Sequence, residues 1–390
     1  MLEPNSRQLF PFDAETTYLN HGGFGVTPND VMDARIRHLK KIEQNPASYV
    51  VCECREKWFE TARLVARRFA VGEKDVALCD NATDGINAIL RSLTFQCGDE
   101  ILYTSTGYGA IIKALTHIGS RQGAKFVEAH IQFPKPDPQQ CLDALKKAIT
   151  PRTKLAVLDH ISAVTALIFP VKEMTKLCHD HGVAVLVDGA HAPGHVAFDI
   201  NDIDADWYVA NLHKWYFAPR ACGFLWRSPT RQSKLDILPS VLSWDIDEGF
   251  PATFAWTGTR DDSRWLSLPE AFKFMDRFGE TQVRGHNHAL IREGVSLLSD
   301  AWGISSGTPD HMIGGMALVP VPDGFSYPAN LEGRQKLKSD FLTQNKIALD
   351  PAFDHQGRIW LRVAAQIYNE RPDFERLAKV ILAMHKPAPS

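Results

Sequence analysis

The sequence has no long hydrophobic run and no marked excess of one charge. No apolar stretch in its 390 residues approaches the roughly 18 residues that a membrane-spanning helix needs. The first residues, MLEPNSRQLF, include Glu3 and no apolar segment, so we expect no secretory signal peptide. The formal net charge of −3 gives no reason to expect nucleic acid or a membrane surface as a partner. Small molecules remain the expected ligands.

Cysteine is also sparse. The seven cysteines are odd in number and follow no regular framework, which predicts reduced thiols and a cytoplasmic location. Cys52 and Cys54 lie only one residue apart, a poor spacing for zinc, and no second pair completes a site. The histidines within residues 178–181 and 286–288 have no distant partner ligand, and histidine in a last helical turn suits the helix dipole. We therefore expect no metal site.

What the chain does contain is an ordinary globular composition. Hydrophobic residues make up 44% and charged residues 23%, which is sufficient for a large core. The length suggests two domains, or one large and one small. Apolar spacing predicts helices over residues 53–70, Leu268–Phe278 and His286–Trp302. No internal repeat or low-complexity segment is present.

Two short apolar runs near the middle of the chain carry the functional signal. Val183–Val187 and Trp207–Ala210 are typical of buried strands. The first run ends at Asp188, and the second leads within four residues to Lys214. Ligands of open α/β sheets bind at the carboxyl ends of the strands, so we expect this carboxylate and this amine to meet in one crevice.

This pair of groups suits pyridoxal phosphate chemistry. A lysine amine forms Schiff bases with carbonyl compounds, and an aspartate can keep the pyridine nitrogen of the cofactor protonated. Trp215, Tyr216 and Phe217 crowd Lys214, and partial desolvation would lower the pKa of its amine and favour the nucleophilic form. A buried Asp–Lys ion pair within an aromatic core remains an alternative on spacing alone.

Two longer motifs resemble a known family. DGAHAPGH, followed by ADWYVANLHKWYFAPRACGFLW, is similar to the cofactor signature of class V aminotransferases, which are fold-type I pyridoxal phosphate enzymes. Within them it most resembles the isopenicillin N epimerase and carbon–sulfur lyase subgroup. The resemblance extends from Tyr18 to about Asn369 and includes several motifs in the expected order.

The resemblance implies an α/β fold with two domains. We expect a large domain with a mostly parallel central sheet flanked by helices, and a smaller C-terminal α+β domain. The predicted divisions are an N-terminal segment, residues 1–28, over the active site; a large cofactor-binding domain, residues 29–255; and a small domain, residues 256–390.

The resemblance assigns the catalytic roles to three residues. Lys214 would hold the cofactor covalently and, once released by substrate, act as the general base at Cα. Asp188 would partner the ring nitrogen. His191 stands at the family position that contacts the phenolic oxygen or the ring.

Other positions are expected to hold the cofactor phosphate and ring. An apolar strand runs into a helix near Ala82 and Thr83, and helix N-termini bind phosphate well, although a routine capped turn would look the same. By resemblance, Asn211 and His213 lie near the phosphate. Thr259 would reach the phosphate of a neighbouring subunit, which implies a homodimer with shared active sites; an exposed loop is the alternative.

Further ring and substrate contacts also follow from the resemblance. Tyr108 would stack on the pyridine ring, unless it merely packs under a helix, and one of residues 162–165 would lie near the phenolic oxygen. Asn20, His21 and Gly22 would border the substrate, although their glycine-rich segment also reads as a simple turn.

The strongest substrate contact is an arginine within an apolar run. Arg362, in WLRVAAQIYN, needs an anionic partner if it is buried. A guanidinium binds a carboxylate through two hydrogen bonds, and the family pattern, with Tyr368 and Asn369 after the arginine, agrees with a role for Arg362 in binding the substrate α-carboxylate. A structural ion pair is the alternative.

The sequence leaves the reaction type open. The motifs NATDGINAILRSL and NLHKW most resemble those of the epimerase, so we favour an epimerase-like enzyme that abstracts the Cα proton of an amino acid or its conjugate. Carbon–sulfur lyase and aminotransferase activities remain alternatives, as does a catalytically silent binding protein. No cysteine follows Cys222, which argues against persulfide transfer, since that reaction needs a mobile cysteine in the small domain.

Overall fold

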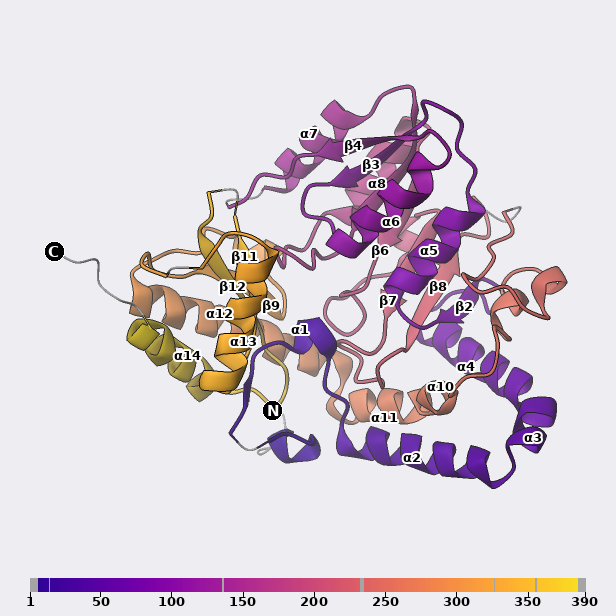
Figure 1. The fold of residues 1–390 in the computed structure, drawn as a ribbon, viewed down its shortest axis with the longest axis horizontal. Helices are drawn as coiled ribbons and strands as arrows, with labels where there is room; N and C mark the ends of the chain where they lie inside the picture. The colour runs from indigo at the N-terminus through magenta and orange to yellow at the C-terminus, as the bar shows by residue number, and fades with distance from the viewer. Residues whose placement is uncertain are drawn as a thin grey trace.

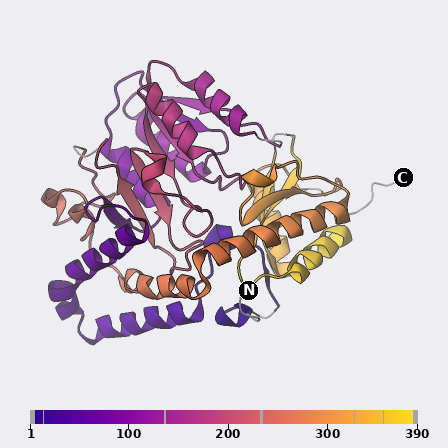
Figure 2. The same cartoon turned by 180° about the vertical axis from the view of Figure 1, so that it is seen from behind.

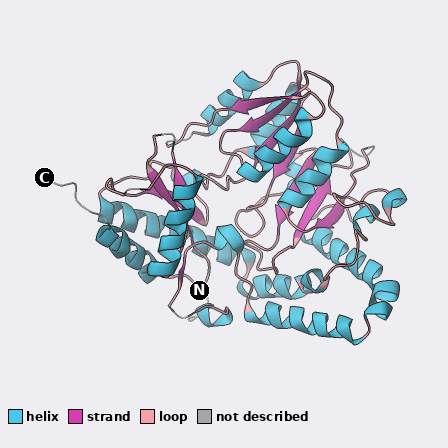
Figure 3. Ribbon diagram, viewed as in Figure 1, coloured by secondary structure: helices cyan, strands magenta, loops and turns pink. Residues whose placement is uncertain are grey.

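The structure is a computed structural model that describes residues 6–13, 15–134, 137–231, 235–325, 327–354 and 356–384. It contains a larger unit built on a seven-stranded sheet and a smaller unit built on a three-stranded sheet (Figure 1). Helices flank the strands of the larger sheet (Figure 3). The predicted fold class, α/β with a mostly parallel central sheet, is confirmed.

The seven-stranded sheet has the order β2-β8-β7-β6-β5-β3-β4. The strands from β4 to β7 are parallel, whereas β8 is antiparallel to both β7 and β2. Its central strands are almost wholly buried because helices cover both faces, and continuous apolar runs such as AVLV in β6 suit that environment. The strands are β2 Val76–Cys79, β3 Glu100–Thr104, β4 Lys125–Ala129, β5 Thr153–Asp159, β6 Ala184–Asp188, β7 Trp207–Asn211 and β8 Gly223–Arg227.

In the larger unit, α2 and α4 precede the first strand of the sheet, and α5, α6, α7 and α8 alternate with its strands. Several have side-chain caps; Asn81, for example, accepts a hydrogen bond from the N–H of Asp84 at the start of α5. The longer helices are α2 Asn29–Gln44, α4 Cys54–Arg68, α5 Ala82–Ser92, α6 Gly109–Ser120, α7 Pro138–Ala148, α8 Val171–Asp180 and α11 Leu268–Phe278. The shorter ones are η1 Ser6–Leu9, α1 His21–Phe24, α3 Pro46–Ser48, η2 Tyr49–Glu53, α9 Ile200–Ile203, η3 Ile246–Glu248, η4 Ala252–Phe254, α10 Ser263–Leu266 and η5 Asp310–Met312.

The smaller unit is an antiparallel sheet covered by helices. Its strands, in the order β11-β12-β9, are β9 Met316–Pro320, β11 Asp350–Phe353 and β12 Ile359–Ala364. The long helix α12, Glu280–Trp302, runs from the larger unit into the smaller one (Figure 2) and packs against α14, Arg371–Met384. Helix α13, Leu331–Gln344, contacts β11. The N-terminal strand β1, Thr17–Tyr18, joins this unit by pairing with β10, Ile347–Ala348.

Each unit has its own hydrophobic core. The larger core includes all the strands of the seven-stranded sheet and also α11, whose Phe272 and Met275 are buried in it. Along α12, Val283 belongs to the larger core, whereas Leu290 and Ile291 belong to the smaller core, which also includes Leu19 near the N-terminus. The domain boundary predicted between residues 255 and 256 stays a prediction. The side chains of α12 pass from the larger core to the smaller core within that helix. No described helix combines the length and the apolar character needed to cross a membrane.

Candidate active site

A cavity of about 480 Å³ opens at the carboxyl ends of the central strands. The loops after β3, β5, β6 and β7 supply most of its walls, and the start of α5 and the N-terminal loop complete them. It gathers ionisable side chains from distant parts of the sequence. The lining residues are Gly23, Asn81, Ala82, Thr83, Tyr108, Ala110, Asp159, Ile161, Ala163, Asp188, Ala190, His191, Asn211, His213 and Lys214.

The N-terminal loop packs tightly on the segment that carries Lys214. Gly25 has a φ of +61°, and a Cβ atom there would lie 2.0 Å from the carbonyl oxygen of His213. Only glycine allows both this backbone conformation and this close approach. The glycine-rich stretch predicted to be a simple turn or an active-site loop therefore contributes to the cavity wall through Gly23.

Lys214 and His191 are in contact within the cavity. The Nζ atom of Lys214 lies 2.9 Å from Nε2 of His191. Burial lowers the pKa of Lys214 to about 8, with the opposing attraction of Asp188 second in size. Burial likewise lowers the pKa of His191 well below its ordinary value, and the nearby charge of Lys214 adds to that shift. His191 is thus a neutral imidazole at neutral pH.

The indole of Trp215 decides which nitrogen of His191 carries the proton. The Nε1–H group of Trp215 can only donate, and it lies 3.5 Å from Nδ1 of His191. Nδ1 is then the acceptor, so the proton of the neutral ring resides on Nε2 and points at Lys214. An amine that accepts this hydrogen bond must be unprotonated. The arrangement therefore favours the nucleophilic form of Lys214.

Asp188 has a second carboxyl group beside it. Asp159 ends β5, is the register partner of Asp188 at the end of β6, and lines the same cavity. Burial raises the pKa of Asp159 well above its ordinary value, and repulsion from Asp188 adds to the effect. Burial also raises the pKa of Asp188, but the N–H of Ala190, 3.0 Å from Oδ1, and the charge of Lys214 oppose the shift. Asp159 thus holds a proton more readily than Asp188.

The N-terminus of α5 provides an anion site at one end of the cavity. The N–H of Ala82 is already occupied, since it donates to Oδ1 of Asn211 at 2.8 Å. Within the described part of the chain, the backbone N–H of Thr83 has no acceptor, and Thr83 itself lines the cavity. Asn211 therefore orients the start of the helix, and Thr83 has a free donor for a phosphate.

His213 lies on the same wall of the cavity. Its Nδ1 donates to the carbonyl oxygen of Cys222 at 3.0 Å, which leaves Nε2 as the free ring nitrogen. Burial lowers the pKa of His213 to about 4, and the charge of Lys214 lowers it further. A bound phosphate would oppose both effects and favour a protonated ring that donates through Nε2.

Tyr108 and residues 162–165 occupy the far side of the cavity. Tyr108 precedes α6 and is 45% exposed, so its ring is available to a ligand. Ser162 is fully buried and uses its hydroxyl within the loop: it donates to the carbonyl of Thr106 and accepts from the N–H of Thr165. Of residues 162–165, only Ala163 lines the cavity.

Arg362 lies at the edge of the cavity. Its Nη1 donates to the carbonyl oxygen of Ala163, and its Nη2 lies 3.3 Å from Oδ1 of Asn20 and 3.0 Å from Oδ2 of Asp350. Arg362 and Asp350 are register partners on β12 and β11. The side chain is 6% exposed, and the ion pair considered as an alternative is present. Arg362 still lies beside a residue that lines the cavity.

Four residues predicted for the site do not line this cavity: Asn20 and Arg362 lie beside it, and His21 and Thr259 lie away from it. His21 is fully buried behind the wall, where its Nδ1 lies 2.8 Å from the hydroxyl of Tyr368 and its ring packs against Trp215 and Phe217. Burial lowers its pKa to about 3. Thr259 is exposed and does not line the cavity of its own chain.

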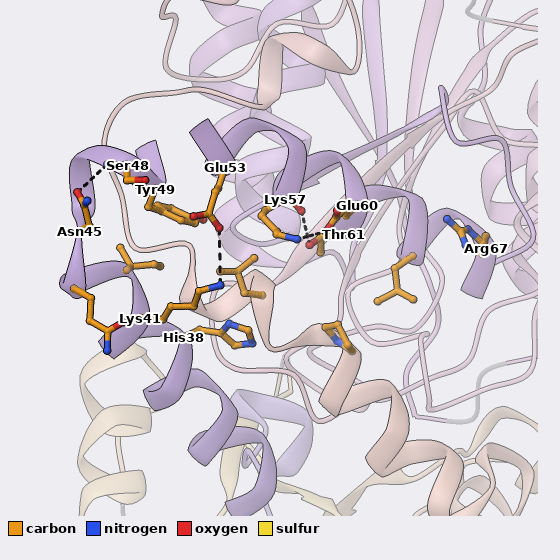
Figure 4. A pocket seen from close by; sticks show the side chains of 15 residues that line it. His38, Lys41, Asn45, Ser48, Tyr49, Glu53, Lys57, Glu60, Thr61 and Arg67 are labelled. Atoms are coloured by element: carbon orange, nitrogen blue, oxygen red, sulfur yellow. Dashed lines mark hydrogen bonds and ion pairs between the residues drawn. The ribbon is translucent and has the colours of Figure 1, made fainter. Parts of the chain in front are cut away.

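A second cavity of about 610 Å³ lies between α2 and α4 (Figure 4). Its charged side chains are largely paired with one another: Lys57 lies 2.7 Å from Glu60, and Lys41 lies 4.0 Å from Glu53. None of the residues predicted for the site lines it. Although it is larger, it lacks the strand-end carboxylates and the buried amine, and we do not assign the chemistry to it.

Comparison with known proteins identifies the family. The family described as Aminotransferase class-V matches residues 17–325. The chain belongs to this family. As a member it is a pyridoxal phosphate-dependent enzyme, and the predicted cofactor is confirmed.

Similar proteins of this family include two kinds of named enzyme. The putative L-cysteine desulfhydrase 1 of Oryza sativa subsp. japonica is 30% identical over 95% of this chain and 83% of that protein. Isopenicillin N epimerase of Streptomyces clavuligerus is 28% identical over 98% of each. A solved structure of the cystine C–S lyase C-DES has a TM-score of 0.81 and 20% sequence identity, and the match covers 97% of this chain and 100% of that chain. That structural likeness establishes the fold alone.

The residues of the cavity fit pyridoxal phosphate. They combine a buried amine, a carboxylate at a strand end, an exposed aromatic ring and a helix N-terminus with a free N–H. Among the described residues, no group of three or more His, Cys, Asp and Glu side chains is arranged to hold a metal ion. The cavity thus contains a nucleophile for an aldehyde, a carboxylate for a protonated pyridine nitrogen and a free N–H for a phosphate.

Three contributors were missed at the level of sequence. Asp159 could have been found, because it too is a polar residue at the end of an apolar strand. The contact between Trp215 and His191 has no sequence signal, since it depends on how two loops fold together. Asp350 became a partner of Arg362 only through the register of β11 on β12.

Proposed function

We propose that the enzyme cleaves the carbon–sulfur bond of an L-cysteine derivative by β-elimination. The observation that carries this proposal is the contact of Lys214 with His191, which favours the basic form of one buried amine in the cavity. Elimination needs one base, and the cavity provides one amine with a lowered pKa.

Each cavity residue has a definite part in this reaction. Bound pyridoxal phosphate supplies an electron sink for the pair of electrons released at Cα. Lys214 takes the Cα proton through Nζ, and His191 holds that amine unprotonated through its Nε2–H. Asp188 carries the negative charge that pairs with a protonated pyridine nitrogen. Asn20 and Arg362 are proposed to bind the substrate carboxylate, whereas His21 supports the wall behind them.

The elimination balances without an external oxidant. The electron pair of the Cα–H bond becomes the Cα–Cβ double bond, and sulfur leaves with the electron pair of the Cβ–S bond. Lys214 can return its proton to the departing thiolate, and water completes the products, a 2-oxo acid and ammonia. None of the seven cysteines lines the cavity, so sulfur is expected to leave as a free thiol or sulfide rather than pass to the enzyme.

Epimerisation is the second candidate, and Tyr108 is the observation in its favour. A proton must then return to Cα from the face opposite Lys214, and Tyr108, which follows β3 and is separated from the end of β7 by β5 and β6, has a hydroxyl on that side. The similarity to isopenicillin N epimerase supports this alternative. The two reactions share every step up to the loss of the Cα proton, and the fate of the sulfur substituent separates them.

A homodimer with shared active sites is part of the proposal. Exposed apolar side chains gather on two segments, residues 50–51 and 241–246. Arg55, which follows the first segment, pairs with Asp245 and Glu248 in and after the second. The exposed apolar side chains are Val50, Val51, Val241, Leu242, Trp244 and Ile246, of which Trp244 is 87% exposed. Thr259 follows the second segment and is exposed, as a residue that reaches a partner's phosphate would be. The substitution Trp244→Glu should yield monomers with weakened cofactor binding, measured by light scattering and absorbance.

We propose a cytoplasmic location from the state of the cysteine thiols. All seven cysteines are free, and five of them are buried, which suits a reducing compartment such as the cytoplasm.

One experiment separates the two reactions. Purified enzyme loaded with pyridoxal phosphate is incubated in deuterated water with L-cysteine and, in parallel, with an L-amino acid that has no leaving group. Pyruvate and sulfide from L-cysteine support elimination. Deuterium at Cα with inversion, without pyruvate, would support epimerisation and overturn the proposal. If L-cysteine yields no pyruvate and neither substrate exchanges its Cα proton, both reactions are excluded.

A further inference from the structure

Three cationic side chains share a single carboxylate beside the cavity. Asp350 lies 3.0 Å from Arg362, 3.0 Å from Arg334 and 3.2 Å from Lys338. We call these four residues the Asp350 cluster. Its charges sum to an excess of two positive charges. The carboxylate of Asp350 is only 12% exposed, so solvent screens these contacts less than it would at the surface.

The imbalance is specific to this part of helix α13. Lys336, on the same helix, has its own carboxylate partner, Asp340, at 3.0 Å. In the ranges that the structure describes, no second carboxylate contacts Arg334, Lys338 or Arg362. The side chains of Arg334 and Lys338 are 39% and 28% exposed, so an anion from solvent can reach the positive charge that Asp350 does not neutralise. The excess therefore points to an anionic ligand.

The cluster lies next to two segments that line the cavity. Arg362 donates to the carbonyl oxygen of Ala163, a lining residue. At the other end, Nζ of Lys338 lies 5.1 Å from the ring centroid of Phe24. Phe24 is 54% exposed and directly follows Gly23, another lining residue. Figure 1 shows α13 next to α1, the short helix that carries Phe24.

We propose that Lys338 and Arg334 form a second anion subsite, which binds a carboxylate at the far end of the substrate's sulfur substituent. The inference rests on the proposed function. An α-carboxylate at Arg362 would neutralise one of the two excess charges, and the second would remain for another anion. The ammonium of Lys338 sits on a flexible stem, so it can reach a carboxylate, and the exposed ring of Phe24 offers an apolar surface to the connecting methylene groups. The enzyme's substrates are then S-substituted cysteines with an acidic substituent.

Two probes of the same size test this preference. S-carboxymethyl-L-cysteine and S-carbamoylmethyl-L-cysteine differ only in the charge of the terminal group. Their dissociation constants are measured from the change in the visible absorption of the loaded enzyme. We expect the unaltered enzyme to bind the acid roughly fivefold to tenfold more tightly than the amide, the effect of a partly exposed charge site.

Variants on α13 locate the preference. Lys338→Met should remove most of the preference, so that the ratio of the dissociation constants of amide and acid approaches one. Lys338→Glu should invert the preference. Lys336→Met loses the same charge from the same helix outside the cluster and should retain the preference. The thermal unfolding temperature of each variant confirms that all are folded.

The outcomes separate this inference from the proposed function. If both probes bind with equal dissociation constants and both yield pyruvate, the proposed function stands and the subsite is wrong. A preference for the acid that survives in Lys338→Glu would also overturn the assignment to Lys338. If neither probe perturbs the absorption, while L-cysteine does, the cavity takes no S-substituent and the subsite is again wrong. If none of the three compounds acts, both proposals fail.

Discussion

Two groups of ionisable side chains lie at two sides of the active-site cavity, and burial has a different outcome for the carboxyl groups in each. The lysine cluster consists of Lys214, His191, Asp188 and Asp159; there burial is the largest influence and favours the neutral form of every member. In the Asp350 cluster, burial acts to raise the pKa of Asp350, but the three cations in contact outweigh it and the pKa is lowered.

The difference shows what decides the use of a buried charge. Where opposite charges are in direct contact, ionisation survives burial and the groups serve as fixed charges for binding. Where they are not, burial brings the two charge states close in free energy, and the groups can exchange protons. We therefore propose that the larger unit supplies the proton chemistry and that the smaller unit supplies most of the charge that binds substrate.

Removal of the amine should have the largest effect. Lys214→Ala eliminates the group proposed to take the Cα proton, and we expect turnover to fall by about 10³-fold to 10⁴-fold. The phosphate contacts are untouched, so the variant should still bind pyridoxal phosphate noncovalently. Pyruvate release and bound cofactor are measured on the same samples, with Lys336→Ala as the control for loss of a lysine. Turnover within tenfold of the unaltered enzyme would remove Lys214 from this role.

Removal of the guanidinium should weaken substrate binding and spare the cofactor. Arg362→Ala leaves the substrate carboxylate without its partner, at a cost of about 2–5 kcal/mol of binding free energy, as for other buried charge pairs. The apparent dissociation constant of L-cysteine should rise accordingly while that of pyridoxal phosphate stays the same. An unchanged affinity for L-cysteine would reduce Arg362 to a structural partner of Asp350.

The lowered pKa of Lys214 predicts the pH dependence of cofactor loading. Only the unprotonated amine attacks the aldehyde, and burial brings its pKa down to about 8. The rate at which the cofactor-free protein acquires its visible absorption should therefore rise with pH up to about 8 and then level off. A rate that continues to rise towards pH 10 would show an ordinary lysine and contradict the account of the lysine cluster.

A smaller change should follow from loss of the indole N–H. Trp215→Phe removes the donor that fixes the proton of His191 on Nε2, so protonated Lys214 should become easier to form. The midpoint of cofactor loading should move upward by up to about one pH unit, since one hydrogen bond contributes about 0.5–1.5 kcal/mol. In a His191→Gln background the same substitution should have no further effect, because glutamine has no tautomer to select. A full shift in that background would assign the effect to packing.

The larger unit could be predicted from the sequence to a considerable depth. Its strands are continuous apolar runs, and the polar residue at the end of a run marks the cavity, as Asp188 does. The helix Leu268–Phe278 has the bounds that its apolar spacing predicted. The helix predicted from His286 begins instead at Glu280, because its first turns carry few apolar residues and give no periodic signal.

The smaller unit was less predictable for a physical reason. Arg362 was recognised as a buried cation in need of an anion, but its partner depends on the register of β11 on β12, and a shift of one residue would turn Asp350 to the other face. The position of His21 likewise depends on Tyr368, which is 347 residues away in sequence. The roles predicted for the site residues stay predictions, and these residues are Asn20, His21, Ala82, Thr83, Tyr108, Asp188, His191, Asn211, His213, Lys214, Thr259 and Arg362.

The most direct test of the central claim is to reduce the loaded enzyme with borohydride and locate the cofactor by peptide mass analysis. The visible absorption should disappear on reduction, and a single pyridoxyl group should be found on the peptide that contains Lys214. Protein that stays colourless with added pyridoxal phosphate, or a label on a different lysine, would contradict the account.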